Sequence, residues 1–192
     1  MTERVAVLLD FQNVHLVGHG IFSRGIEAHR CVLNPGRLAD LIASKRRRPS
    51  VAAAVRVFRG RPDPGHQARL TASNDAQAAQ WTRDQRVQVM RRQLVYRDWP
   101  NLPPVEKGID VAVAVDLMRL AFGRQYDALV LFSSDSDLMP ALEAVVEMRL
   151  THVEVACWRG GNQLRFPGTS LPWCHSLTDS DWTAVVDDWQ RR

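Results

Sequence analysis

Aspartates stand at the ends of two apolar runs and at the start of an apolar helical segment. Asp10 ends the first run, Asp135 and Asp137 follow the last long one, and Asp110 opens the helical segment. In an open parallel α/β sheet, ligands bind outside the carboxyl ends of the strands, so these aspartates are expected in one crevice. Crowded carboxylates repel one another, and such a cluster is typical of a site that holds a divalent cation.

Short polar side chains accompany these carboxylates and could contact a substrate. Asn13 follows Asp10 by three residues, and Ser134 and Ser136 alternate with the later aspartates. Serine hydroxyls and exposed backbone N–H groups can bind a phosphate at the start of a helix. Lys107 lies three residues before Asp110 and could meet a phosphate as well. We therefore expect Asn13, Lys107, Ser134 and Ser136 to bind substrate.

Each aspartate also has a purely structural interpretation. Asp10 and Asp110 could cap the helices that follow them, and one aspartate after the late strand, Asp135, could cap its own helix. Asp116 lies six residues after Asp110, about 600° around a helix of 3.6 residues per turn, and is off the Asp110 face. It either reaches the edge of the cleft or forms an ion pair with an arginine such as Arg119.

The apolar pattern predicts strands that alternate with helices. Asn34 is expected to cap the first predicted helix, because Pro35 suits its first position. This alternation predicts an α/β fold with a mostly parallel central sheet and right-handed crossovers, in one domain over residues 1–192. The expected strands are 4–10, 51–58, 87–96, 127–133, 152–157 and 173–177, and the expected helices are 35–47, 66–83, 109–122, 137–149 and 180–190.

Charge is distributed unevenly along the 192 residues. Residues 37–97 carry 14 Lys/Arg and 4 Asp, a net charge of +10, whereas the remainder carries −6. A basic surface attracts phosphates through counterion release, and an acidic site can hold a metal. The run Lys45-Arg46-Arg47-Arg48 fits this interpretation, although arginines also simply solvate helix faces.

Other features exclude several classes of protein. No stretch approaches the ~20 apolar residues of a membrane span, and the apolar run before Asp10 is too short for a secretory signal, so we expect a cytoplasmic protein. The three cysteines suggest neither disulfides nor zinc. His15 and His19 have the spacing of some zinc helices, but Gly18 and Gly20 argue against a stable helix there.

Taken together, the motifs resemble the NYN domain of the PIN-like nuclease superfamily, most closely its bacterial LabA-like branch. The resemblance spans about residues 4–157, with residues 59–97 matched by topology alone. One departure is Ser134, which stands where the family often has glycine. The matching pieces are Leu9-Asp10-Phe11-Gln12-Asn13, the segment Lys107-Gly108-Ile109-Asp110 through Asp116, and Ser133-Ser134-Asp135-Ser136-Asp137-Leu138 followed by Pro140.

The resemblance implies a three-layer α/β/α sandwich and metal-dependent ribonuclease activity. Asp10, Asp110 and Asp135 would be metal-site carboxylates, with Asp137 as a further catalytic ligand and Asn13 orienting the site. Carboxylate oxygens suit Mg²⁺ or Mn²⁺ better than zinc. The expected partner is RNA, most simply single-stranded RNA, whose backbone an open crevice can reach; a homodimer stays an open alternative.

Several other functions fit less well. Some relatives bind RNA or act as adaptors without cutting, and a non-catalytic module of that kind is the main alternative. A haloacid-dehalogenase-type phosphatase would need a second aspartate where Gln12 stands. A dinucleotide enzyme would need a Gly-x-Gly-x-x-Gly motif after the first strand. A Toprim domain would need a glutamate in place of Asp10.

Overall fold

The computed structural model describes residues 1–169 and 171–188. Among these, six strands form one parallel sheet in the order β4-β3-β1-β5-β6-β7. The carboxyl ends of all six strands therefore meet at one edge, as the sequence predicts. The strands are β1 (Glu3–Asp10), β3 (Ser50–Arg61), β4 (Val87–Gln93), β5 (Ala128–Phe132), β6 (His152–Trp158) and β7 (Trp173–Leu177).

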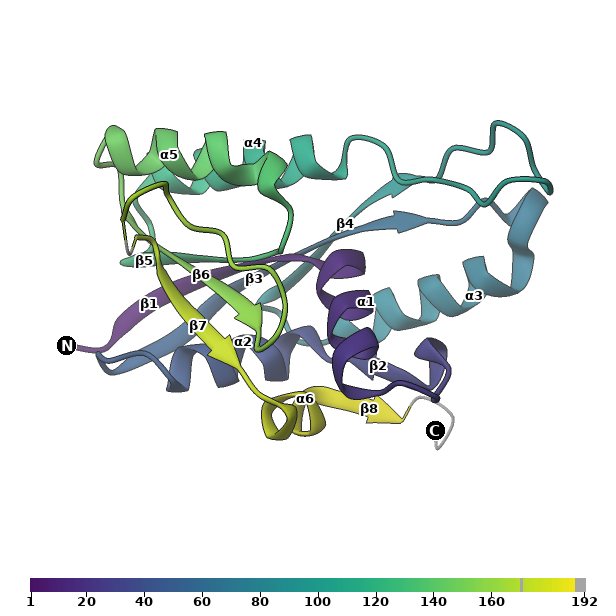
Figure 1. The fold of residues 1–192 in the computed structure, drawn as a ribbon, viewed down its shortest axis with the longest axis horizontal. Coiled ribbons are helices and arrows are strands. Elements are labelled where there is room, and N and C mark those ends of the chain that lie inside the picture. The colour runs from purple at the N-terminus through teal and green to yellow at the C-terminus, as the bar shows by residue number, and fades with distance from the viewer. Residues whose placement is uncertain (170, 189–192) are drawn as a thin grey trace.

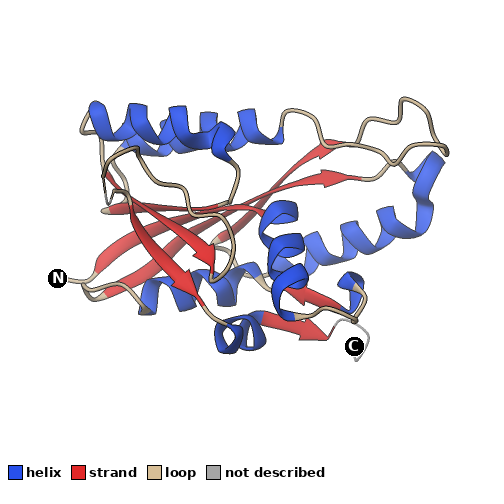
Figure 2. Ribbon diagram, in the orientation of Figure 1, coloured by secondary structure: helices blue, strands red, loops and turns tan. Residues whose placement is uncertain are grey.

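Helices cover both faces of this sheet (Figure 1). Two of them, α4 and α5, pack on one face, and α1, α2, α3 and α6 pack on the other. Figure 2 shows the same three layers by secondary structure. The expected three-layer α/β/α fold is thereby confirmed. The helices are α1 (Phe11–Phe22), α2 (Pro35–Ser44), α3 (Pro64–Trp81), α4 (Ile109–Gly123), α5 (Met139–Glu147) and α6 (Asp179–Val185).

The central strands are buried on both faces, which explains their continuous apolar sequences. In β1, Val5, Val7 and Leu9 face the α1 and α2 side, whereas Ala6 and Leu8 face α4 and α5. Both sets are almost fully inaccessible to solvent. A strand that offers no polar face can sit only in the middle of a sheet, and its last residue, Asp10, is thereby fixed at the carboxyl edge.

Helix α1 contradicts the expectation that glycines prevent a helix around His15 and His19. The helix runs through both Gly18 and Gly20. A Cβ atom at Gly18 would overlap the Trp182 ring and lie 2.7 Å from Nε1 of Trp158. Glycine at position 18 therefore allows α1 to approach two tryptophans closely. This packing outweighs the cost of about 1 kcal/mol that glycine carries relative to alanine inside a helix.

The carboxyl-terminal region also departs from the predicted elements. The helix expected over 180–190 is α6, which ends at Val185 and is followed by strand β8 (Val186–Asp188). Residues 189 and 190 lie outside the described residues. Strand β8 pairs antiparallel with a short strand, β2 (Cys31–Leu33), which follows the 3₁₀ turn Ala28–Arg30. The predicted capping of α2 by Asn34 is confirmed, since Oδ1 of Asn34 accepts the N–H of Arg37 at 3.1 Å.

No helix within residues 1–169 and 171–188 combines enough length with enough apolar character to cross a lipid bilayer.

Candidate metal centre

Asp10 is the most buried carboxylate of the candidate site. It ends β1 and is 4% exposed, and its side chain makes no capping hydrogen bond to α1. The hydroxyl of Ser133, at the end of neighbouring β5, donates to Oδ2 of Asp10 at 2.9 Å. Burial, together with the charges of Glu106 and Asp110, raises the pKa of Asp10 to about 6, against the lowering effect of the hydrogen bond from Ser133.

Asp110 lies in the first turn of α4, where the backbone of Gly108 sets its position. Gly108 precedes the helix with a φ of 73°, in the left-handed region that glycine adopts without steric cost. Burial raises the pKa of Asp110, and the charges of Asp135 and Asp137 raise it further. The helix start thus directs a carboxylate toward other carboxylates.

Asp135 belongs to the loop that leaves β5. Its Oδ1 accepts the N–H of Asp137 at 2.9 Å and so caps a 3₁₀ turn, Ser136–Leu138, as predicted for this aspartate. Its own N–H donates to the Ser133 hydroxyl at 3.1 Å. One oxygen of Asp135 is used by the cap, and the carboxylate still points into the site.

The structure brings three of the predicted carboxylates together. Asp10, Asp110 and Asp135 each place an oxygen within 4.8 Å of the other two. Among the described residues, no Lys, Arg or His forms an ion pair with any of these three. A divalent cation fits this set of oxygen donors, because it would offset the repulsion among the three carboxylates. Asp137 lies outside this group, although its charge acts on Asp110.

Asn13 and Ser134 form hydrogen bonds with each other. Oδ1 of Asn13 accepts both the N–H of Ser134 at 2.9 Å and its hydroxyl at 2.8 Å. Nδ2 of Asn162 donates to the carbonyl oxygen of Ser134 at 2.8 Å. These bonds fix the loop that carries Asp135 against α1. A direct contact of Asn13 or Ser134 with substrate stays a prediction.

The remaining predicted substrate contacts lie at the surface of the site. Ser136 and Asp137 are exposed in the 3₁₀ turn, and Lys107 is exposed just before α4. Their side chains are accessible to a ligand from solvent. Their roles in binding also stay predictions.

Glu106 is a fourth acidic residue near the cluster, and the sequence reasoning missed it. Its Oε1 accepts the N–H of Gly60, where any Cβ would collide with Leu94 and with Glu106 itself. Burial raises the pKa of Glu106, and its charge in turn raises that of Asp10. Glu106 lies on an irregular loop, which no sequence pattern could place. The only signal in the sequence was the glycine at position 60, which leaves room for another chain segment beside the sheet.

Arg59 is a half-buried cation between the start of α1 and the end of α3. Its guanidinium lies 4.8 Å from the ring centre of Phe11 and 5.2 Å from that of Trp81. Nη1 donates to Oε1 of Gln77 at 2.9 Å, while Nε is buried without a hydrogen bond. Burial lowers the pKa of Arg59 to about 10, although the charge of Glu106 opposes this change. Arg59 therefore packs against the start of α1, the helix that follows Asp10.

Asp116 forms ion pairs with arginines, which is the structural one of the two roles that the sequence left open. Its Oδ1 accepts Nε of Arg119 at 2.9 Å, and its Oδ2 lies 3.7 Å from Nε of Arg56. Asp116 and Arg56 are both buried. Asp116 is not part of the carboxylate group around Asp10.

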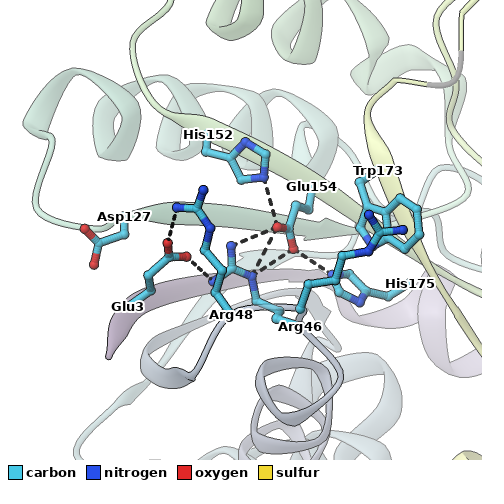
Figure 3. A pocket seen from close by; sticks show the side chains of 9 residues that line it. Glu3, Arg46, Arg48, Asp127, His152, Glu154, Trp173 and His175 are labelled. Carbon is cyan, nitrogen blue, oxygen red and sulfur yellow. Dashed lines mark hydrogen bonds and ion pairs between the residues drawn. The ribbon is translucent and has the colours of Figure 1, made fainter. Parts of the chain in front are cut away.

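Arg46, Arg47 and Arg48 of the basic run line a pocket at the opposite edge of the sheet, where the strands begin (Figure 3). Arg46 is buried there and binds both oxygens of Glu154 at 3.0 and 3.1 Å. Arg48 pairs with Glu3, and Arg47 stacks on Trp173. The run therefore does not lie beside the metal site, where the charge pattern suggested a basic surface, and two of its arginines pair with Glu3 and Glu154 instead.

Comparisons with known proteins agree with this fold. A crystal structure of a protein of unknown function from Vibrio parahaemolyticus superposes with a TM-score of 0.54 at 18% sequence identity, covering 84% of this chain and 85% of that one. That likeness shows the fold alone. None of the curated proteins matches the chain. The sequence model of the NYN domain matches residues 4–165. Because this match spans well over half of the chain, the protein belongs to the NYN domain family, within the PIN-like nuclease superfamily.

Proposed function

We propose that this protein is a metal-dependent ribonuclease that hydrolyses phosphodiester bonds of single-stranded RNA. One observation carries the proposal. Asp10, Asp110 and Asp135 come from three separate segments and still place their oxygens within 4.8 Å of one another, with no cationic partner among the described residues. Folding this cluster is costly without a bound cation, and membership of a nuclease superfamily supports the same activity.

The same three carboxylates would hold the cation, with Asp137 at the rim of the site. Carboxylate oxygens favour hard ions such as Mg²⁺ or Mn²⁺. When bound, the ion supplies Lewis acidity toward the scissile phosphate and makes a water molecule easier to deprotonate.

The protein's own residues prepare this chemistry. Ser133 holds Asp10 and the backbone of Asp135 in one arrangement. Glu106, whose charge acts on Asp10, offers a further carboxylate near the cluster that could accept a proton from water. Asn13 and Asn162 keep the Asp135 loop in place through Ser134.

The test is cleavage of an end-labelled single-stranded RNA in Mn²⁺, compared with the same reaction in EDTA. Asp135→Asn is the decisive variant, because its amide oxygen can still accept the N–H of Asp137 while the negative charge is lost. Asp40→Asn is the matched control: Asp40 is 53% exposed on α2 and pairs with Arg86, away from the cluster. We expect cleavage by wild type and Asp40→Asn, and at least a 100-fold loss in Asp135→Asn.

Two results would contradict the proposal. Asp135→Asn that folds normally and cuts as fast as wild type would remove this cluster from the reaction. RNA binding that persists in EDTA, with no cleavage in any metal, would instead support the non-catalytic module on the same fold.

A further inference from the structure

A groove lies between helix α4 and the edge strand β4. Its volume is about 440 Å³, which is within the range of pockets that hold a small ligand. No role in the candidate metal centre uses this groove. It is lined by Phe58, Met90, Arg91, Arg92, Ile109, Val111, Ala112, Val115 and Asp116.

The walls of the groove combine apolar surface with positive charge. Met90 packs on the α4 side of the sheet, and Arg92, two residues on, shares its face because side chains alternate along a strand. On α4, Val111 and Val115 are 63% and 61% exposed. Apolar side chains one helical turn apart, with nothing packed over them, form a surface suited to a flat apolar group.

Arg92 is an unpaired cation of the groove near the start of α4, the helix that carries Asp110. A Cβ placed on Gly108 would lie 3.8 Å from Cδ of Arg92 and 3.9 Å from its Nε. Arg92 is exposed and has no ion-pair or side-chain hydrogen-bond partner among residues 1–169 and 171–188. Neighbouring Arg91, by contrast, pairs with Asp75. The guanidinium of Arg92 is therefore available to an anion.

The groove lies beside the segment of α4 that carries one of the clustered carboxylates. Ile109 and Val111 line it, and Asp110 between them belongs to the carboxylate cluster. A chain whose phosphate lies at the cluster therefore needs to pass only along the first turn of α4 to reach the groove. A polymer with phosphates and flat bases matches both the free arginine and the exposed valines.

We propose that the α4–β4 groove binds the part of a single-stranded RNA that flanks the cleavage point. Arg92 contacts a backbone phosphate, and a base lies against Val111 and Val115. The proposal rests on the proposed function for the identity of the ligand. What is new is the path of the RNA along the protein, which a binding measurement can test without cleavage.

The first test measures binding of a fluorescent 20-nucleotide RNA by anisotropy, in EDTA, at several salt concentrations. Arg92→Ala is expected to raise Kd about threefold to tenfold and to reduce the salt slope by about 0.7, the loss of one phosphate contact to a single strand. Arg83→Ala is the matched control, because Arg83 is also exposed but lies before β4, at the other edge of the sheet. It should leave Kd unchanged.

The second test addresses the apolar wall. Val115→Glu should weaken RNA binding about tenfold, because a carboxylate there repels phosphates and removes the apolar contact. Phe122→Glu is its control on the same helix: Phe122 is 59% exposed but does not line the groove. Light scattering of wild type checks for a dimer. A wild-type dimer that Val115→Glu and Phe122→Glu both break would show that a second copy of the chain covers this face, and would overturn the proposal.

Failure of this inference is distinguishable from failure of the proposed function. Wild type that cuts RNA, with Arg92→Ala and Val115→Glu binding as tightly as wild type, contradicts the groove alone. Wild type that binds but never cuts, with both variants weakened, contradicts the nuclease and supports the groove. A wild type with no measurable affinity for RNA contradicts both.

Discussion

The hydroxyl of Ser133 joins Asp10 to Asp135. It donates to Oδ2 of Asp10 at 2.9 Å and accepts the N–H of Asp135 at 3.1 Å. Ser133 is 1% exposed, so water cannot replace either bond easily. One buried hydroxyl therefore links the carboxylate of Asp10 to the backbone of Asp135.

Ser133→Ala is expected to weaken metal binding while the fold persists. The substitution removes a partner of the Asp10 carboxylate and leaves the N–H of Asp135 unsatisfied, at a cost of about 1–3 kcal/mol in the free energy of unfolding. Loss of such a supporting contact lowers metal affinity about 10- to 100-fold. Calorimetric titration with Mn²⁺ and urea unfolding measure the two effects separately.

Ser44→Ala is the matched control for this prediction. The Ser44 hydroxyl donates to a backbone carbonyl at the exposed end of α2, at 2.7 Å. Its removal should leave Mn²⁺ affinity unchanged and alter stability by about 0.5 kcal/mol or less. Equal Mn²⁺ affinities of Ser133→Ala and wild type would show that Ser133 does not organise the cluster.

Asp116→Asn is expected to lower stability without changing Mn²⁺ affinity. Asp116 is paired with Arg56 and Arg119, and removal of its charge leaves the buried Arg56 without compensation. We expect a loss of about 2–4 kcal/mol in urea unfolding, close to the cost of breaking a buried ion pair. A large loss of Mn²⁺ affinity in a folded Asp116→Asn variant would instead place Asp116 among the ligands.

The location of the aspartates was predictable because it follows from chain-local rules. A strand that is apolar on both faces must lie inside a parallel sheet, and the residue that ends it must lie at the carboxyl edge. Asp10 obeys this rule directly, and Asp135 follows it from the loop that leaves β5. Asp110 follows from a glycine and the start of an apolar helix.

The missed features all depend on contacts between distant segments. Glu106 reaches the site only because Gly60 lacks a side chain, and helix α1 contains Gly18 because two tryptophans pack against it. Arg46, within a basic run, is buried by Glu154, 108 residues away. No pattern within a short window indicates which partner a loop or a charged side chain will meet.

The stability of the metal-free protein should depend on the charge of Asp10. Its pKa is about 6 in the folded protein, against 3.8 without the fold, so between about pH 4 and pH 6 the folded state binds more protons than the unfolded chain. Stability therefore falls as pH rises through this window, by up to about 3 kcal/mol from this residue. Asp10→Asn removes that loss.

We expect the stability difference between Asp10→Asn and wild type to grow in favour of the variant from pH 4 to pH 7, in urea unfolding with EDTA. Using the difference cancels the other titrating groups. Addition of Mn²⁺ should stabilise wild type far more than the variant, since only a ligand that binds the folded state shifts the equilibrium. A difference that stays constant with pH would contradict the burial of an uncompensated charge at Asp10.

Arg46 and Glu154 provide the last prediction, which separates stability from activity. The Arg46 side chain is 4% exposed and the Glu154 side chain 7%, and Glu154 also accepts from His175 at 2.6 Å. The hydrogen bonds from His152, His175 and Arg46 hold the pKa of Glu154 well below its usual range, so this stabilisation is lost as pH falls below about 4.5.

Arg46→Met should cost about 3–5 kcal/mol in the free energy of unfolding, because it leaves a buried carboxylate without its main partner. Arg46→Met combined with Glu154→Leu should recover most of that loss, since two apolar side chains can replace a buried ion pair. Urea unfolding measures both variants. RNA cleavage per folded molecule should equal that of wild type, because the pair lies at the opposite edge of the sheet from Asp10; a cleavage defect in the folded double variant would show that the two edges are coupled.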